Sequence, residues 1–197
     1  MRPYIINIVI FIHFMIFIYF FLIFKYFFSL YIIYSLFKMN ISNSKFNRDK
    51  IQGDYYEKEA LKYLKYDSYK ITQGYFKEYD IITYRKEGIV EKIEVKSDRL
   101  SSKTGNLCIE YQYKGCDSGI NTTEADYYFY FVLFCEDNNI YGGNVNKYEL
   151  YKIPVDELKE LVKNCYSVSG GDGGYSKMYL LPKYKCKDYL FITKKLK

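Results

Sequence analysis

The chain has 197 residues, enough for one ordinary domain and an appended segment. Apolar residues make up 49 %, and the net charge of +6 permits a polyanionic partner without requiring one. The five cysteines include no CxxC pair, and the single histidine, His13, lies in the apolar N-terminus. This pattern argues against a zinc site built from cysteine and histidine, and it favours reduced thiols in a cytosolic protein.

Residues 1–38 form a hydrophobic segment, in which 4–24 carry no formal charge. Such a run is long enough to cross a bilayer as a helix, and the Lys and Arg residues that follow it would keep the next domain in the cytoplasm. Met39 follows directly, so a second interpretation stays open, in which the protein starts there. We therefore expect either a membrane anchor through 4–37 or a cytoplasmic protein without one.

Residues 39–50 are polar and predict a linker to a domain over 51–197. A helix is predicted over 53–64, because Tyr56, Ala60 and Leu64 share one helical face. Asp54 is placed to be its N-cap, with Glu57 three residues later in the capping-box position.

Strands and a second helix are predicted further along the chain from apolar alternation and turn residues. The expected elements are a hairpin of 79–84 and 89–96 turning at 86–88, strands at 107–113 and 127–135, a helix start or turn at 122–126, a strand within 140–145, a helix over 155–163, a glycine-rich loop at 169–174, and short closing elements at 179–181 and 189–193. This order predicts an α/β or α+β domain with a mixed sheet flanked by helices.

The hairpin carries the residues with the clearest chemical potential. Ile93 and Val95 point to one face of its second strand, and Glu94 and Lys96 point to the other. A partner strand that begins at Asp80 can bring that carboxylate beside Glu94, where the two repel unless a cation neutralises them. Mg²⁺ prefers such oxygen ligands, and Lys96 can hold a water or offset the charge of a phosphate. A surface hairpin with ordinary charge pairs is the alternative.

The spacing of Asp80, thirteen further residues and then Glu94-Val95-Lys96 resembles the PD-(D/E)xK nuclease superfamily, which has the restriction-endonuclease-like fold. The helix with Gly53 and Glu57 resembles the first helix of that family. Tyr79 stands where the name-giving proline would be. Further stretches look like small nucleases of phages and large DNA viruses: 104–107, 109–111, 118–120, 123–128, 170–174 and 179–182. The resemblance covers most of 53–182.

This resemblance implies a site in which Asp80, Glu94 and the Val95 carbonyl bind Mg²⁺, or Mn²⁺ in its place. Lys96 would position the attacking water. Glu57 would be an additional acidic group, although the capping box is an equally good role for it.

Three more residues are candidates for the same site. Ser118 and Thr123 can contact phosphate or cap the next helix, and capping is the role we favour. Asp126 can be a third acid, although acids at that position commonly serve a helix dipole. The glycine-rich 170–174 lacks Gly-Lys-Ser/Thr, so we exclude a nucleotide site there. It is either a flexible loop or a close approach to a nucleic-acid backbone.

The function expected from these residues is Mg²⁺-dependent hydrolysis of DNA phosphodiester bonds, in the manner of an endonuclease. Two alternatives stay open: a catalytically silent, membrane-anchored binding protein that kept the fold, and a nuclease directed at RNA.

Overall fold

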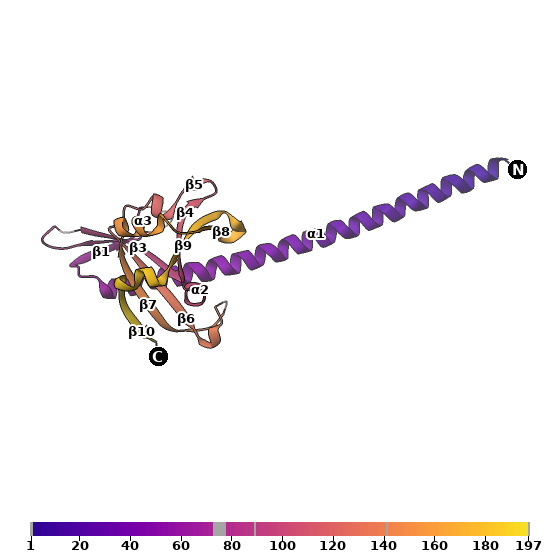
Figure 1. Ribbon diagram of the computed structural model, residues 1–197. Coiled ribbons are helices and arrows are strands. Elements are labelled where there is room, and N and C mark those ends of the chain that lie inside the picture. Colours follow the sequence, from indigo (N-terminus) through magenta and orange to yellow (C-terminus); the bar gives the residue numbers. More distant parts are fainter. Residues whose placement is uncertain (1, 73–77, 89, 141, 197) are drawn as a thin grey trace. The chain divides into compact units, whose positions relative to one another are not determined.

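The computed structural model describes residues 2–72, 78–88, 90–140 and 142–196, and it omits the side chains of 2–16, 18, 22, 36–46 and 172 (Figure 1). The chain divides into two compact units, 1–48 and 49–197. Helix α1 (Arg2–Ala60) runs through the first unit and contributes its last turns to the second. A short 3₁₀ turn, η1 (Leu61–Tyr63), follows it.

The length of α1 corrects two expectations. Residues 39–50 are helical and not an irregular polar segment, because no proline or glycine lies between residues 4 and 52 to interrupt the helix. Asp54 therefore lies inside a helix and cannot be its N-cap; it accepts a hydrogen bond from Lys50, one turn earlier, at 3.0 Å. Glu57 likewise has no capping-box role.

Among the residues that the structure describes, no helix combines the length and the apolar character that crossing a membrane requires. Most of the expected span at 4–24 lies among residues whose side chains are not described. The membrane anchor therefore stays a prediction.

The second unit is built on a six-stranded mixed sheet with the strand order β1-β2-β3-β6-β7-β10. Only β3 and β6 run parallel to each other, and all the other neighbours are antiparallel. The strands are β1 (Ser68–Ile71), β2 (Ile81–Tyr84), β3 (Val90–Asp98), β6 (Tyr127–Cys135), β7 (Val145–Pro154) and β10 (Leu190–Lys195). The mixed sheet expected from the sequence is thus confirmed.

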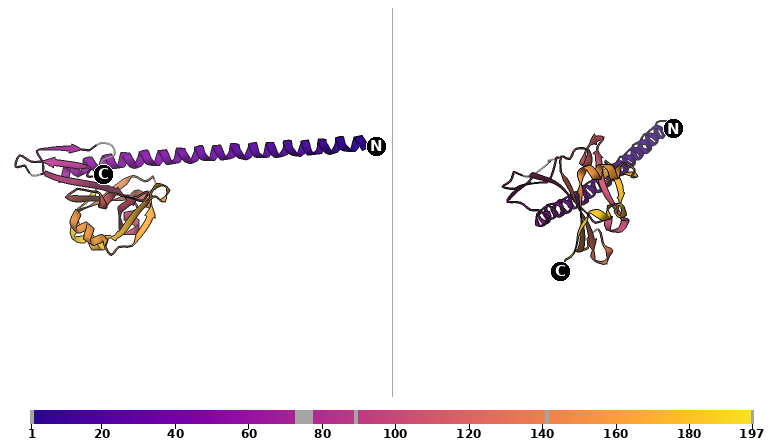
Figure 2. Two further views of the ribbon diagram at one scale, coloured as in Figure 1. Left: turned by 90° about the horizontal axis from the view of Figure 1, so that it is seen from above. Right: turned by 60° about the vertical axis from the view of Figure 1, so that its left-hand side comes forward.

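A separate four-stranded antiparallel sheet has the order β5-β4-β9-β8, and the sequence did not predict it. Figure 1 shows β4, β5 and β8 together, apart from β7 and β10, and Figure 2 gives two further views. Its strands are β4 (Asn106–Tyr113), β5 (Cys116–Asp117), β8 (Ser167–Gly170) and β9 (Ser176–Pro182). The helical elements after η1 are α2 (Ser101–Thr104), η2 (Gly119–Asn121), η3 (Glu136–Asn138), α3 (Val155–Val162), η4 (Asp172–Gly174) and η5 (Lys183–Tyr189).

Two hydrophobic cores lie on opposite faces of the main sheet. The first joins the end of α1 to the sheet through Tyr56 and Ala60, which pack with Ile93, Val95 and Phe129. The second fills the other face, where Tyr128 and Tyr130 of β6 pack with residues of β4, β9 and α3. Alternate side chains of β6 are buried in the two cores, so both faces of this strand are apolar. Its continuous apolar sequence therefore marks a buried central strand, as predicted.

Several other expectations are confirmed within about two residues at their ends. These are the β2–β3 hairpin, β4, α3 and β10; the closing element expected at 179–181 falls within β9, which begins three residues earlier, at Ser176. Residues 122–126 form a turn and not a helix, since β6 follows directly. Four strands were missed: β1, the short β5, β8, which overlaps the glycine-rich loop expected at 169–174, and β7, which begins only at Val145, where the prediction ended. Lysine and glutamate alternate with the buried side chains of β7 and weaken its apolar signal.

Glu59 fastens the end of α1 to the sheet. Its side chain is buried, and it accepts hydrogen bonds from the Tyr148 hydroxyl at 2.7 Å and the Lys194 ammonium at 2.8 Å, and pairs with Lys62. Burial alone would raise the pKa of Glu59, but the hydrogen bonds from Lys194, Lys62 and Tyr148 outweigh it and lower the pKa to about 2.

We expect Glu59→Gln to lose about 1–3 kcal/mol of unfolding free energy at pH 7, because Lys194 is left beside an uncharged amide. A carboxyl with a depressed folded pKa stabilises the fold above its unfolded pKa, and this contribution disappears as the pH falls from about 4.5 to about 2. Urea unfolding at several pH values should therefore show the gap between the two proteins closing in that window.

Glu160→Gln is the matched control, because Glu160 pairs with Lys163 on the exposed surface of the chain. It should change stability by less than about 0.5 kcal/mol. An equal loss in both variants would contradict the role given to Glu59.

Candidate active site

Asp80, immediately before β2, is hydrogen-bonded to the main chain on both sides of Glu94. Its N–H donates to the Ile93 carbonyl at 2.9 Å, and its Oδ2 accepts from the Val95 N–H at 2.7 Å. The antiparallel register of β2 and β3 pairs Ile81 with Ile93, and its extension by one residue places Asp80 opposite Glu94. Asp80 and Glu94 are therefore direct neighbours across the hairpin.

Glu94 and Lys96 form an ion pair on the face of β3 opposite Ile93 and Val95. Glu94 is 7 % exposed, and its Oε1 lies 2.7 Å from the Lys96 Nζ, whose side chain keeps 44 % of its surface exposed. Burial raises the pKa of Glu94, and the negative charge of Asp80 adds to this, against the opposing effect of Lys96. One ammonium therefore balances a pair of crowded carboxylates.

Lys96 keeps its proton at neutral pH. Partial burial on its own would lower its pKa, but the negative charges of Glu94 and Asp80, together with the hydrogen bond to Glu94, raise the pKa of Lys96 well above the ordinary value. Tyr128, 1 % exposed, lies opposite Glu94 on β6. Lys96 can thus donate hydrogen bonds to a water or a phosphate oxygen, and it is not suited to accept a proton.

Glu57 faces the same group of charges from α1. Burial, followed by the negative charges of Asp80 and Asp54, raises its pKa to about 7, while Lys96 acts in the opposite direction. With the capping box excluded, this proximity is the role that the structure leaves for Glu57.

Glu110 adds a fourth carboxylate, which sequence reasoning did not assign to the site. It lies on β4 of the second sheet, and its charge helps to raise the pKa of Glu94, after the larger effects of burial, Lys96 and Asp80. The Ser118 hydroxyl donates to Glu110 Oε1 at 2.6 Å. A carboxylate in the apolar stretch Leu107–Tyr111 was the one signal that could have identified it.

Ser118 therefore orients a carboxylate and does not cap a helix. It occupies the position before η2 (Gly119–Asn121), but its side chain makes no capping hydrogen bond there. The expectation of a cap is wrong because the Ser118 oxygen accepts no N–H of η2, while its hydroxyl proton goes to the Glu110 carboxylate.

Thr123 and Asp126 brace the turn before β6. The Thr123 hydroxyl donates to the Glu78 carbonyl at 2.9 Å, and Asp126 Oδ2 accepts from the Lys92 N–H at 2.7 Å. No helix follows them, so neither a cap nor a helix-dipole acid describes them. Asp126 thus lies beside Lys92, two residues before Glu94 on β3, and Thr123 lies beside Glu78, before Asp80.

The Val95 carbonyl points to the side of β3 that holds Asp80. Its N–H bonds the Asp80 carboxylate, and the N–H and C=O of one strand residue face the same edge. Asp80, Glu94 and this carbonyl form an all-oxygen donor set, which suits Mg²⁺ or Mn²⁺ and not a soft metal.

In the part of the chain that the structure describes, no three His, Cys, Asp or Glu side chains are gathered as a ready metal site. Lys96 and the Val95 N–H each engage one carboxylate oxygen. A cation would therefore displace Lys96 from Glu94 before it could bind there.

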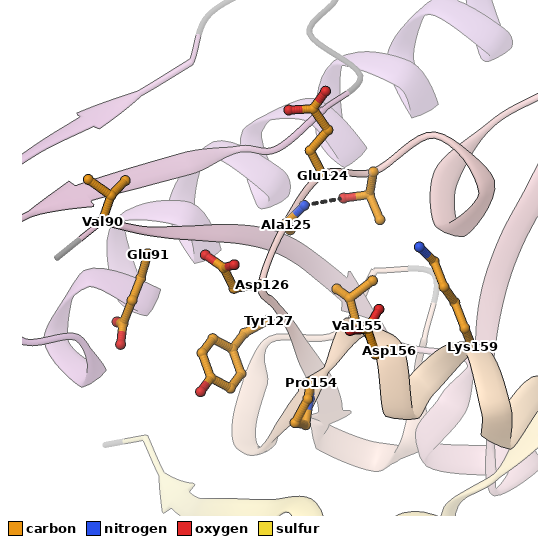
Figure 3. Close-up of a pocket in the computed structure, with 11 residues that line it drawn as sticks. Val90, Glu91, Glu124, Ala125, Asp126, Tyr127, Pro154, Val155, Asp156 and Lys159 are labelled. Atoms are coloured by element: carbon orange, nitrogen blue, oxygen red, sulfur yellow. Dashed lines mark hydrogen bonds between the residues drawn. The ribbon is translucent and has the colours of Figure 1, made fainter.

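A separate hollow of about 530 Å³ lies at the beginning of β3 and β6 (Figure 3). Its described lining includes four acids, Glu91, Glu124, Asp126 and Asp156, and the dashed line in Figure 3 marks the bond from the Ala125 N–H to the Thr123 hydroxyl. Arg85 pairs with Glu91, and Lys92 pairs with Glu124. Asp80, Glu94 and Lys96 are not among its described lining residues, so the hollow is distinct from their cluster.

Comparisons of the chain with protein-family models, with curated proteins and with solved structures found no match.

The close approach of Gly119 to Glu110 gives a test of how the fourth carboxylate is held. Gly119 has φ +52°, and a Cβ there would lie 2.3 Å from the Glu110 carbonyl oxygen. We expect Gly119→Ala to lose about 3 kcal/mol or more of unfolding free energy, from backbone strain together with the clash.

Gly105→Ala is the control, because its φ is +69° and nothing lies within 4 Å of an added Cβ. It should lose only the strain contribution, about 1–2 kcal/mol. Urea unfolding of both variants measures the difference. Equal losses would show that the contact with Glu110 does not constrain residue 119.

Proposed function

We propose that the chain is a Mg²⁺-dependent nuclease that hydrolyses phosphodiester bonds of DNA, acting as an endonuclease. The observation that carries the proposal is the pair of hydrogen bonds from Asp80 to the main chain on both sides of Glu94, with the Lys96 ammonium 2.7 Å from Glu94. One carboxylate just before β2, one carboxylate on β3 and a charged lysine are thereby held close together.

The charge balance of this cluster favours a divalent cation. Asp80 helps to raise the pKa values of both Glu57 and Glu94, and Glu110 helps to raise that of Glu94. Lys96 opposes both shifts, and Lys50 also opposes the one at Glu57. Crowded carboxylates repel, and the raised pKa values of Glu57 and Glu94 express that repulsion. Asp80, Glu94 and the Val95 carbonyl would hold Mg²⁺, which would neutralise them and lower the pKa of a bound water.

The remaining steps fall to side chains of this chain. The protonated Lys96 would donate a hydrogen bond to the attacking water or to a phosphate oxygen, and so place the water opposite the leaving group. Glu57, with a pKa of about 7, can exchange a proton near neutral pH. Glu110, which Ser118 orients, would add a further negative charge near the metal.

The fold is compatible with this proposal. The end of α1 packs on a mixed sheet, the β2–β3 hairpin carries Asp80 and Glu94, and β6 runs parallel to β3. This arrangement fits a restriction-endonuclease-like core of the kind that the sequence resembles. The finer assignment to that fold is part of the proposal.

The first test is cleavage of supercoiled circular DNA by the full chain, with Mg²⁺ or with EDTA. We expect nicked circles only with Mg²⁺, and a loss of at least about 100-fold in rate in Asp80→Ala and in Lys96→Ala, because each removes a group that acts in the transition state. Asp156→Ala should cleave at the normal rate, since Asp156 lines the separate hollow. DNA cleavage that survives in Asp80→Ala would overturn the assignment of the site.

Binding of Mg²⁺ alone supplies an independent prediction. At about 100 times its Kd, the ion should raise the Tm by roughly 5 °C or more, because it binds the folded state only. Asp80→Ala should abolish this rise, and Asp156→Ala should keep it. A rise without DNA cleavage would redirect the proposal to RNA, and the absence of any rise would argue against the metal.

A further inference from the structure

We propose that Tyr113, Lys114 and Tyr175 form a binding surface for unpaired nucleotides, which we call the Tyr–Lys–Tyr surface. The inference rests on the proposed nuclease function and names the form of nucleic acid that the site would take. It is carried by contacts that no other part of the proposed mechanism uses.

The surface is built where two hairpins meet. Lys114 and Gly115 form the two-residue loop between β4 and β5, since Tyr113 pairs with Cys116. The Lys114 N–H donates to the Tyr175 carbonyl at 3.0 Å, which joins this loop to the glycine-rich turn η4 (Asp172–Gly174) before β9. The tips of both hairpins of the second sheet are thus held together.

Both tyrosine rings are exposed, and both face the same ammonium. Tyr113 is 38 % exposed and Tyr175 is 56 % exposed, and the Lys114 Nζ lies 5.4 Å and 5.3 Å from their ring centroids. Exposed rings of this kind stack on bases whose faces are uncovered, and a neighbouring cation offsets the phosphates. Bases inside a duplex already stack on each other, so the surface selects unpaired nucleotides.

Lys114 is placed there at a cost. Its φ is +49° and that of Gly115 is +83°, the pattern of a hairpin turn that favours Asn-Gly or Gly-Gly. A lysine in this conformation is strained by about 1–2 kcal/mol. In the described part of the chain, no carboxylate pairs with its ammonium, and the nearby Asp117 accepts instead from Asn121. A lysine held in a strained conformation, with no carboxylate on its ammonium, is available to contact a phosphate.

The position of the surface relates it to the catalytic cluster. Tyr113 lies three residues from Glu110 on β4, about 10 Å along a strand. Nucleotides stacked on the two rings would therefore continue toward Glu94, whose pKa Glu110 affects. This favours DNA that carries a single-stranded stretch next to the cleaved bond.

The test is the affinity of the full chain for a fluorescein-labelled oligothymidylate of ~20 nucleotides, measured by anisotropy in EDTA so that no cleavage occurs. We expect Tyr113→Ala and Tyr175→Ala each to weaken binding about tenfold, and Tyr113→Phe and Tyr175→Phe to bind as the unaltered chain does, because the ring and not the hydroxyl stacks. Tyr166→Ala, which removes a tyrosine 87 % exposed elsewhere, should leave binding unchanged.

Lys114→Asn separates binding from folding. Asparagine tolerates a positive φ, so the unfolding free energy should stay the same or rise. The slope of log K for oligothymidylate binding against log salt concentration should become less steep by about 0.7, because one phosphate contact is lost. A duplex of the same length should bind more weakly and should be insensitive to Tyr113→Ala.

The outcomes distinguish this inference from the nuclease proposal. Normal oligothymidylate binding in both alanine variants, or equal losses in the alanine and phenylalanine variants, would overturn the surface and leave the nuclease standing. Ring-dependent binding by a chain that cleaves no nucleic acid would support the surface and overturn the nuclease.

Discussion

One hydrogen bond, from the Val95 N–H to the Asp80 carboxylate, holds the catalytic candidates together. It ties the chain just before β2 to the middle of β3, at the point where β3 leaves the hairpin and continues beside β6 alone. A charge-assisted bond of this kind is strong and directional. Without it, the Asp80 carboxylate would lose its fixed orientation, although the Asp80 N–H would still hold the backbone to Ile93, and the contribution of Asp80 to the raised pKa of Glu94 would weaken.

The fold tolerates this crowding because β3 is fixed on both faces by other interactions. Ile93 and Val95 are buried against the end of α1, and Tyr128 of β6 closes the opposite face beside Glu94. Glu59 adds a polar fastening of α1 to β7 and β10. The two hydrophobic cores therefore stabilise the fold enough to offset the repulsion among the carboxylates.

The sequence predicted those elements whose side-chain pattern is complete within a few residues. The alternation from Ile93 to Lys96 and the apolar run of β6 each identify a strand without outside information. The hairpin of β2 and β3 follows from the turn at Gly88 between them. These features place Asp80, Glu94 and Lys96 correctly relative to one another, while their catalytic roles remain a proposal.

What the sequence could not predict depends on partners that are distant in the chain. Glu110 joins the cluster only because β4 belongs to a second sheet, and no local pattern encodes the packing of two sheets. The capping box at Asp54 failed for a related reason: the motif is correct locally, but a longer uninterrupted helix includes it. Lysine and glutamate on the partly exposed positions hid β7, although its buried Tyr148, Leu150 and Ile153 complete both cores.

The parallel pairing of β3 with β6 also determines the order in which the site can assemble. Parallel neighbours require a crossover, and here the crossover contains β4, β5 and η2, so it carries both Glu110 and Ser118. Contacts between segments so far apart form late, because the entropy of closing the loop must be overcome first. The hairpin can bring Asp80 to Glu94 early, whereas the fourth carboxylate arrives only with the closing of the crossover. Early in folding, the site would thus bring together Asp80 and Glu94 without Glu110.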